Sequence, residues 1–226
     1  MSNSKDEKLI EAMAEAGVAY GHRTSRLHPK MKPYIEGVKA GVHIIDLNKT
    51  SEKLQKALSF LAEVKKENKQ VLLVGTKVQL QSLILEVAQE IEMPYVNQRW
   101  LGGTLTNFKI ISQRIRDLIE KEDQREKGDF ERYTKKEQLE IDREIDRLNR
   151  NFGGLKLMKD LPAAVFITDL DKNELAAREA RRRGIKSVGL VDTNINPEIV
   201  DYPIPANDDA LSSVKFILEE VKKVLK

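Results

Sequence analysis

Basic side chains gather in two stretches of this 226-residue chain that contain no acidic residue. Residues 16–35 and residues 93–116 lack Asp and Glu, although the chain carries 36 acids in all. The bases in these two acid-free windows are Arg23, Arg26, Lys30, Lys32, Arg99, Lys109, Arg114 and Arg116. Local positive charge of this kind favours a surface that binds a polyanion, with ordinary solvated loops as the alternative interpretation. Aromatic side chains that could stack on nucleic-acid bases lie among them, namely Tyr20, Tyr34, Tyr95 and Trp100.

Catalytic chemistry has few possible carriers in the chain. Cys is absent, which removes disulfides, thiol nucleophiles and thiolate zinc sites together. No Gly-x-Ser-x-Gly nucleophile elbow occurs, and all three His precede residue 44. A divalent ion held by His22 with Asp192 or Asp46 is an alternative, but we expect no metal site. We interpret Asp208 and Asp209 as charges that favour the start of the last helix. The sequence therefore predicts a protein that is not an enzyme and holds no cofactor.

The phosphate-binding motifs of nucleotide enzymes are also missing. Only Gly75 follows the apolar run Val71–Val74, and the chain has neither Gly-x-Gly-x-x-Gly nor Gly-x-x-x-x-Gly-Lys-Ser/Thr. Gly102-Gly103-Thr104 follows another apolar run, but a single Gly pair is weak evidence for a phosphate site. We interpret the polar residues after these runs as turn formers and helix caps. A nucleotide-dependent enzyme on a Rossmann-like fold remains the alternative function.

The elements that position these residues can be read from the apolar pattern. Continuous apolar runs predict buried parallel strands at Val42–Ile45, Val71–Val74, Pro94–Val96, Ala164–Ile167 and Val188–Val191. Amphipathic helical stretches alternate with them near residues 49–67, 79–91, 172–183 and 208–225. This alternation predicts an α/β fold with a doubly wound, mainly parallel sheet of the Rossmann or flavodoxin type.

Residues 107–152 differ from the rest in composition. This segment of 46 residues holds 12 Lys or Arg and 12 Asp or Glu, so 24 of its residues are charged and their net charge is zero. Two helical stripes run through it, one formed by Ile111, Ile115, Leu118 and Ile119 and the other by Ile141, Ile145, Leu148 and Phe152. We predict an antiparallel helical hairpin, a coiled coil, inserted into a globular α/β domain made of residues 1–106 and 153–226.

The overall composition fits a soluble protein. Lys and Arg total 39 against 36 acids, and 40% of the residues are hydrophobic, which excludes disorder throughout. No apolar run approaches the ~18 residues that a membrane span needs. The polar start of the chain, Met1 to Glu7, predicts no signal peptide. We therefore expect a cytoplasmic protein without a membrane partner.

Several motifs in order along the chain resemble one family. They are Gly21-His22-Arg23-Thr24, His28–Pro33, Gly41–Thr50, Val74–Lys77, Tyr95–Asn107, Val191–Asn194 and Ile204–Ala210. Together they are similar to the bacterial small-subunit ribosomal protein S2 family, and the resemblance covers roughly residues 4–225. It implies a structural constituent of the small (30S) ribosomal subunit that binds small-subunit (16S) rRNA between head and body. It also implies that the chain helps to anchor ribosomal protein S1 for translation and contacts neighbouring small-subunit proteins, with no small-molecule substrate.

Three positions depart from the family pattern that we expect. Leu27, Ala163 and Ala206 stand where Trp, Asp and Gly are usual, but none of these changes removes a base. The predicted RNA contacts are therefore the eight bases of the acid-free windows, with Trp100 as packing or stacking support. Such bases reach phosphates and the shape of folded RNA, because A-form RNA hides its base edges in a deep, narrow groove. A second candidate patch, or an ordinary solvated helix face, is formed by Arg178, Arg181, Arg182 and Arg183.

Overall fold

Short runs of buried apolar residues form the central sheet of the computed structural model, which describes residues 3–226. β4 (Val71–Val74) and β6 (Ala164–Ile167) are buried at every position, as strands covered on both faces must be. β5 (Tyr95–Val96), β7 (Lys186–Val191) and β8 (Tyr202–Pro205) complete a parallel sheet in the order β5-β4-β6-β7-β8. The prediction of a doubly wound α/β fold is confirmed.

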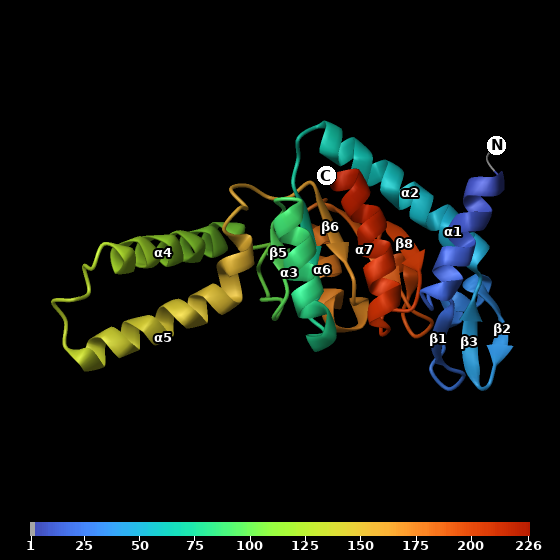
Figure 1. Ribbon diagram of the computed structural model, residues 1–226, viewed down its shortest axis with the longest axis horizontal. Helices are drawn as coiled ribbons and strands as arrows, with labels where there is room; N and C mark the ends of the chain where they lie inside the picture. Colours follow the sequence, from blue (N-terminus) through green and yellow to red (C-terminus); the bar gives the residue numbers. More distant parts are fainter. Residues whose placement is uncertain (1–2) are drawn as a thin grey trace.

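Helices cover both faces of this sheet (Figure 1). One face packs against α2 (Leu47–Lys66), α3 (Gln81–Glu90) and α7 (Leu211–Leu225), whose apolar sides bury Leu73 and Phe166. The other face presents Leu72 and Val165 to α6 (Leu170–Arg182). α1 (Asn3–Glu15) packs against α2 at the edge of the first layer. Alternate residues of each strand thus enter two separate cores, because successive side chains point to opposite faces.

A second sheet corrects one sequence prediction. Val42–Ile45 is β3, and it lies between β1 (Tyr20–Arg23) and β2 (Ile35–Lys39) in an antiparallel sheet rather than in the main parallel one. Its residues alternate between half-buried and buried, the pattern of a strand covered on one face only. Ala40 and Gly41 both have positive φ, and they form the tight turn that joins β2 to β3. The apolar run was thus wrongly assigned to the main sheet.

β8 was also not predicted from the sequence. Its residues Tyr202-Pro203-Ile204-Pro205 include two prolines, which cannot donate hydrogen bonds within a sheet. The strand pairs only with β7 and lies at the edge of the sheet, where missing donors are tolerated.

α4 (Phe108–Glu126) and α5 (Lys135–Phe152) lie between β5 and β6 in the chain and extend away from the rest of the molecule (Figure 1). They pack against each other through buried residues that include Ile115 and Leu118 of α4 and Ile145 and Leu148 of α5. Thr134 begins α5 and forms a capping box with Glu137, three residues later, the spacing that such a box requires. Because Ile111 and Phe152 join the same core as the sheet residues, the division of the chain into two domains stays a prediction. Within residues 3–226, no helix is long and apolar enough to cross a bilayer.

Candidate nucleic-acid interface

The bases of the first acid-free window lie between the end of β1 and the start of β2. Arg23 ends β1, Arg26 lies in the following turn, and Lys30 and Lys32 belong to a 3-10 helix, Pro29–Tyr34. All four are exposed. Lys30 pairs with Glu198, whereas the structure gives Arg23, Arg26 and Lys32 no ion pair among residues 3–226. Most of the positive charge of this window is therefore open to an outside anion.

The second window places its bases on the loop after β5 and on the first turns of α4. Arg99, Lys109, Arg114 and Arg116 are all exposed. Arg114 Nη1 lies 3.7 Å from an oxygen of Asp117, while Arg116 donates to Gln113 Oε1 at 2.7 Å. Arg99 and Lys109 form no ion pair in the described part of the chain.

A buried carboxylate from α6 holds the loop of the second window in place. Glu179 Oε1 accepts the N–H of Gly103 at 2.8 Å, and Oε2 accepts the N–H groups of Leu105 and Thr106 at 3.0 and 3.1 Å. Burial by itself would raise the pKa of Glu179, but these N–H donors favour the ionised form and lower the pKa. Sequence reasoning missed this residue, because an acid in an Arg-rich helix gives no signal of its own.

Trp100 is a core residue rather than an exposed platform. Its side chain is 7% exposed, and its indole Nε1–H donates to Glu179 Oε1 at 3.2 Å. The ring therefore packs and fixes the loop that carries Arg99. Of the two roles expected for Trp100, the structure places it in the packing one.

α6 connects the two windows. Its Glu179 binds the loop of the second window, and its Asp171 and Glu174 line a hollow together with His28 of the first window. The second candidate patch lies on the same helix: Arg178 pairs with Glu174, and Arg181 donates to the carbonyl oxygen of Ile199 at 3.0 Å. Arg182 and Arg183 are exposed and form no ion pair within residues 3–226. One helix thus binds the loop of the second window, shares a hollow with the first window and carries further bases.

The carboxyl edge of the sheet, where enzymes of this fold hold their ligands, is filled by the chain itself. Asp169 Oδ2 accepts the N–H groups of Thr76 and Lys77, both at 3.0 Å, just after β4. In nucleotide-binding relatives of this fold, N–H groups at this first turn hold a phosphate. Asn173 Nδ2 also donates to Asp169, at 2.8 Å. Burial raises the pKa of Asp169, although the Thr76 N–H opposes the shift. The donors of the turn are therefore already satisfied by a side-chain carboxylate.

Asp208 and Asp209 stand just before α7, where their charge favours the start of the helix, but their side chains do not cap it. Lys77 Nζ lies 2.6 Å from Asp208 Oδ1 and 2.7 Å from Asp209 Oδ1, so the two acids bind the turn after β4. α7 instead has Ala210 as its N-cap, without a side-chain cap bond. Asp208 is 1% exposed, and its burial raises its pKa to about 7 although Lys77 lowers it.

His22 contacts the carboxylates of two different loops. Its Nδ1 lies 3.1 Å from Asp192 Oδ1 and its Nε2 lies 3.5 Å from Asp209 Oδ2. Asp46 is not among its partners, since it caps α2 through the N–H of Asn48. Residues 3–226 contain no group of three or more His, Asp or Glu side chains arranged to hold a metal ion.

Comparison with known proteins decides the family. The model of the family described as "Ribosomal protein S2" matches residues 13–226. The chain belongs to the ribosomal protein S2 family. A relative from Chloroflexus aggregans is 48% identical over 212 residues, which cover 94% of this chain and 89% of the relative. Relatives from Dehalococcoides mccartyi and Chloroflexus aurantiacus are 48% and 49% identical over the same share of this chain and cover 86% and 89% of their own lengths. All three are named small ribosomal subunit protein uS2.

Membership of the ribosomal protein S2 family decides against the alternative of a nucleotide-dependent enzyme. The family is structural and not enzymatic, so the prediction that the chain is not an enzyme is confirmed. The structure of the carboxyl edge agrees with this, because Asp169 accepts the N–H groups that would otherwise bind a nucleotide phosphate.

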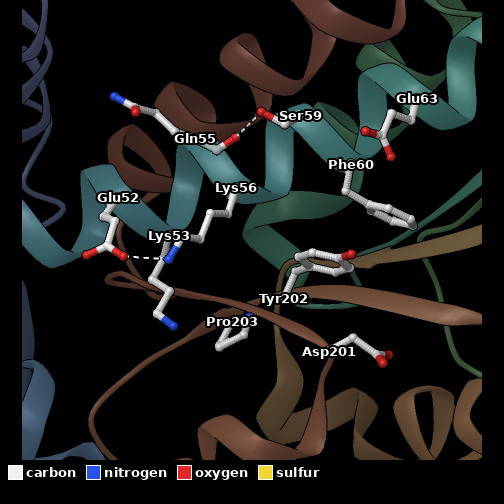
Figure 2. Close-up of a pocket in the computed structure, with 10 residues that line it drawn as sticks. All are labelled: Glu52, Lys53, Gln55, Lys56, Ser59, Phe60, Glu63, Asp201, Tyr202 and Pro203. Carbon is white, nitrogen blue, oxygen red and sulfur yellow. Dashed lines mark hydrogen bonds and ion pairs between the residues drawn. The ribbon is translucent and has the colours of Figure 1, made fainter.

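This S2-family chain also has an open groove between α2 and β8, shown in Figure 2. Phe60 and Tyr202 stack in it with ring centroids 4.5 Å apart and an angle of 11° between the rings. Charges of both signs surround the rings, including Lys53, Glu63 and Asp201. None of the residues that line the groove belongs to either acid-free window. Mixed charge of this kind does not mark a site for a polyanion.

Proposed function

We propose that this chain is a structural constituent of the small ribosomal subunit and binds small-subunit rRNA through its two acid-free windows. The observation that carries the proposal is the exposure of all eight bases, which lie at the end of β1, on the loops after β1 and β5, on the 3-10 helix and on α4. Arg23, Arg26, Lys32, Arg99 and Lys109 form no ion pair among residues 3–226, so RNA phosphates need not displace a carboxylate. Phosphate contacts of this kind fix the position of a protein on RNA without reading its sequence.

Salt dependence tests this proposal. A base that contacts phosphate releases counterions, and each lost contact flattens the plot of log affinity against log salt by roughly 0.7 to 0.9. The triple variant Arg99→Gln, Arg114→Gln, Arg116→Gln should therefore lose about two to three units of slope with deproteinised small-subunit rRNA. Filter binding or fluorescence anisotropy over a series of salt concentrations gives the slope.

The matched control lies toward the far ends of α4 and α5. Lys121 pairs with Glu144 at 2.9 Å and Arg125 lies 3.9 Å from Asp142, so their charges are balanced within the pair of helices. Replacing Lys121, Arg125 and Lys127 by Gln should change the slope little. Equal losses from the two triple variants would contradict the proposal, because position would then not matter.

We also propose that the chain lies between the head and the body of the subunit and helps to anchor ribosomal protein S1. Two features of α4, α5 and the turn between them support a protein-facing surface there. Exposed apolar side chains include Ile119, Tyr133 and Leu139, which are 38%, 39% and 50% exposed. Lys121 and Arg125 of α4 pair with acids of α5, and acids and bases are equal in number over residues 107–152, which leaves little net field to attract RNA. Apolar side chains beside neutralised charge suit a protein partner better than a polyanion.

A further inference from the structure

The loop that carries Arg23 and Arg26 is fastened to the main sheet at both of its ends. Thr193 follows β7, and its Oγ1 accepts the N–H of His22 at 2.9 Å. The carbonyl oxygen of the same Thr193 accepts the N–H of His28 at 2.8 Å. The chain between these two hydrogen bonds, residues 23–27, therefore leaves the sheet and returns to it at one point. We call this segment the basic loop.

The approach of the basic loop to the sheet is close. A Cβ on Gly21 would lie 2.4 Å from Thr193 Cγ2, far inside van der Waals contact, so no other residue fits there without movement. The hydrogen bond from His22 to Thr193 follows directly in the chain. The close contact between β1 and the end of β7 thus depends on the missing side chain of Gly21 and on the backbone N–H of His22.

The ring of His22 adds a second attachment, to two carboxylates on different loops. Nδ1 faces Asp192 at the end of β7 at 3.1 Å, and Nε2 faces Asp209 before α7 at 3.5 Å. A neutral imidazole carries one N–H, whereas the protonated ring carries an N–H on each nitrogen. Only protonated His22 can donate to both carboxylates.

The surroundings of His22 favour its charge. The hydrogen bond to Asp192 raises the pKa of His22 above its usual value, burial opposes this shift, and the charges of Asp209 and Asp208 add to it. Lys77 from the turn after β4 pairs with Asp208 and Asp209 and limits the negative field. The hydrogen bond from Lys77 lowers the pKa of Asp209, and the positive charge of Arg26 in the basic loop adds to this shift. The other side chains around the hollow beside His22 include Tyr20, Ser25 and Asn207, together with Arg23.

We propose that His22 is a positioning residue, which in its protonated form ties the basic loop to Asp192 and Asp209 and so holds Arg23 and Arg26 in place for RNA. The inference rests on the proposed RNA-binding function. A loop that is ordered before binding loses less conformational entropy when the RNA arrives, and this raises affinity. The carboxyl edge, used for ligands by enzymes of this fold, here anchors an interface.

The direction of the pH effect follows from the raised pKa of His22. A group whose pKa is higher in the folded state stabilises that state fully below its usual pKa, and the effect is lost as the pH rises through the raised value. The basic loop should therefore be ordered on the acid side of neutrality and become mobile in mild alkali. RNA affinity should follow the same course.

The test compares His22→Asn with His28→Asn in the full chain. Asn at 22 keeps a neutral donor toward Asp192 but cannot be protonated, and Asn at 28 keeps an oxygen in place of the Nδ1 that accepts the N–H of Lys30. Backbone ¹⁵N relaxation of the RNA-free protein, at about pH 6 and about pH 8.5, reports the order of residues 23–27 on either side of the usual histidine pKa. Binding to deproteinised small-subunit rRNA is measured at the same two pH values.

In the wild-type protein and in His28→Asn, the loop amides should have order parameters near 0.85 in acid and below about 0.6 in alkali. Affinity for rRNA should fall about tenfold over this range, the effect of losing one hydrogen bond between charged groups. His22→Asn should show neither change. Asp209→Asn, at a 58% exposed side chain, should weaken the pH dependence and covers the case in which His22→Asn does not fold.

The possible failures can be told apart. Loop order that is the same at both pH values in the wild type, or pH dependence that survives in His22→Asn, overturns the role of His22. A wild-type protein whose loop responds to pH but which does not bind rRNA at either value contradicts the proposed function instead. A loss of thermal stability in His22→Asn with unchanged pH dependence of affinity would mean that His22 is only structural.

Discussion

Glu179 shows how one side chain can shape a binding surface without facing it. It is 3% exposed, and its two oxygens accept the N–H groups of Gly103, Leu105 and Thr106 as well as the indole N–H of Trp100. A carboxylate is suited to this position, because its oxygens offer about four acceptor sites and its charge strengthens each hydrogen bond. The exposed Arg99 owes its position to this buried acid.

At the scale of residues, Glu179→Ala should therefore lower the free energy of unfolding much more than an ordinary substitution in a helix does. Removal of the carboxylate leaves several buried N–H groups without an acceptor, and we expect a loss of about 3 kcal/mol in the free energy of unfolding. Glu174→Ala is the control on the same helix, since Glu174 forms only an exposed pair with Arg178 and should cost less than about 0.5 kcal/mol. Urea denaturation measures both values.

The pH dependence of the same variants gives an independent check. Because the folded state lowers the pKa of Glu179, its contribution is present above the usual Glu pKa and lost as the pH falls through the lowered value. Glu179→Gln should consequently destabilise the protein at neutral pH and lose this part of the acid sensitivity. If the free energy of unfolding falls equally in wild type and Glu179→Gln between neutral and acid pH, the carboxylate is not the cause of this acid sensitivity.

At the scale of elements, α4 and α5 should be dispensable for folding but not for partner binding. Their chain positions lie between β5 and β6, and the sheet order β5-β4-β6 is complete without them. Replacement of residues 109–150 by a short Gly/Ser linker should leave a cooperative thermal transition, at a lowered midpoint because Ile111, Ile115 and Leu148 leave the shared core. Differential scanning calorimetry follows the transition.

The same linker variant separates folding from anchoring of ribosomal protein S1. Small subunits reconstituted with the variant should retain less S1 than subunits reconstituted with the wild-type chain, as measured by quantitative mass spectrometry after sedimentation. A variant without any cooperative transition would show that the helices belong to one folding unit with the sheet. Normal S1 content in subunits that carry the folded variant would contradict the anchoring role of the two helices.

At the scale of the whole molecule, the main sheet should not bind nucleotides tightly. The phosphate position after β4 is taken by Asp169, and the neighbouring Lys77 is 7% exposed and held by Asp208 and Asp209. Isothermal calorimetry with ATP, GTP, NAD and NADP should show nothing tighter than about millimolar, equivalent to about −4 kcal/mol. A saturable micromolar site with unit stoichiometry would be incompatible with an edge closed by the chain itself.

The sequence determined those features that depend on local pattern. The runs Val71–Val74 and Ala164–Ile167 are short and apolar throughout, the pattern of a strand buried on both faces, so these central strands of the main sheet could be predicted. The two acid-free windows were visible for a similar reason, since charge excluded from a segment is a property of the segment alone. The Thr134–Glu137 capping box is equally local, and the structure shows it.

Only the tertiary structure decided which residues meet across long separations in the chain. Glu179 and the loop at 103–106, Asp169 and the turn at 76–77, and His22 with Asp192 and Asp209 are brought together by the order of the strands. Val42–Ile45 was misplaced for the same reason, because a short apolar run does not encode which sheet it joins. A hydrogen bond or an ion pair depends on distance in space, and a single sequence records distance only along the chain. The residues that position the interface therefore emerged only with the fold.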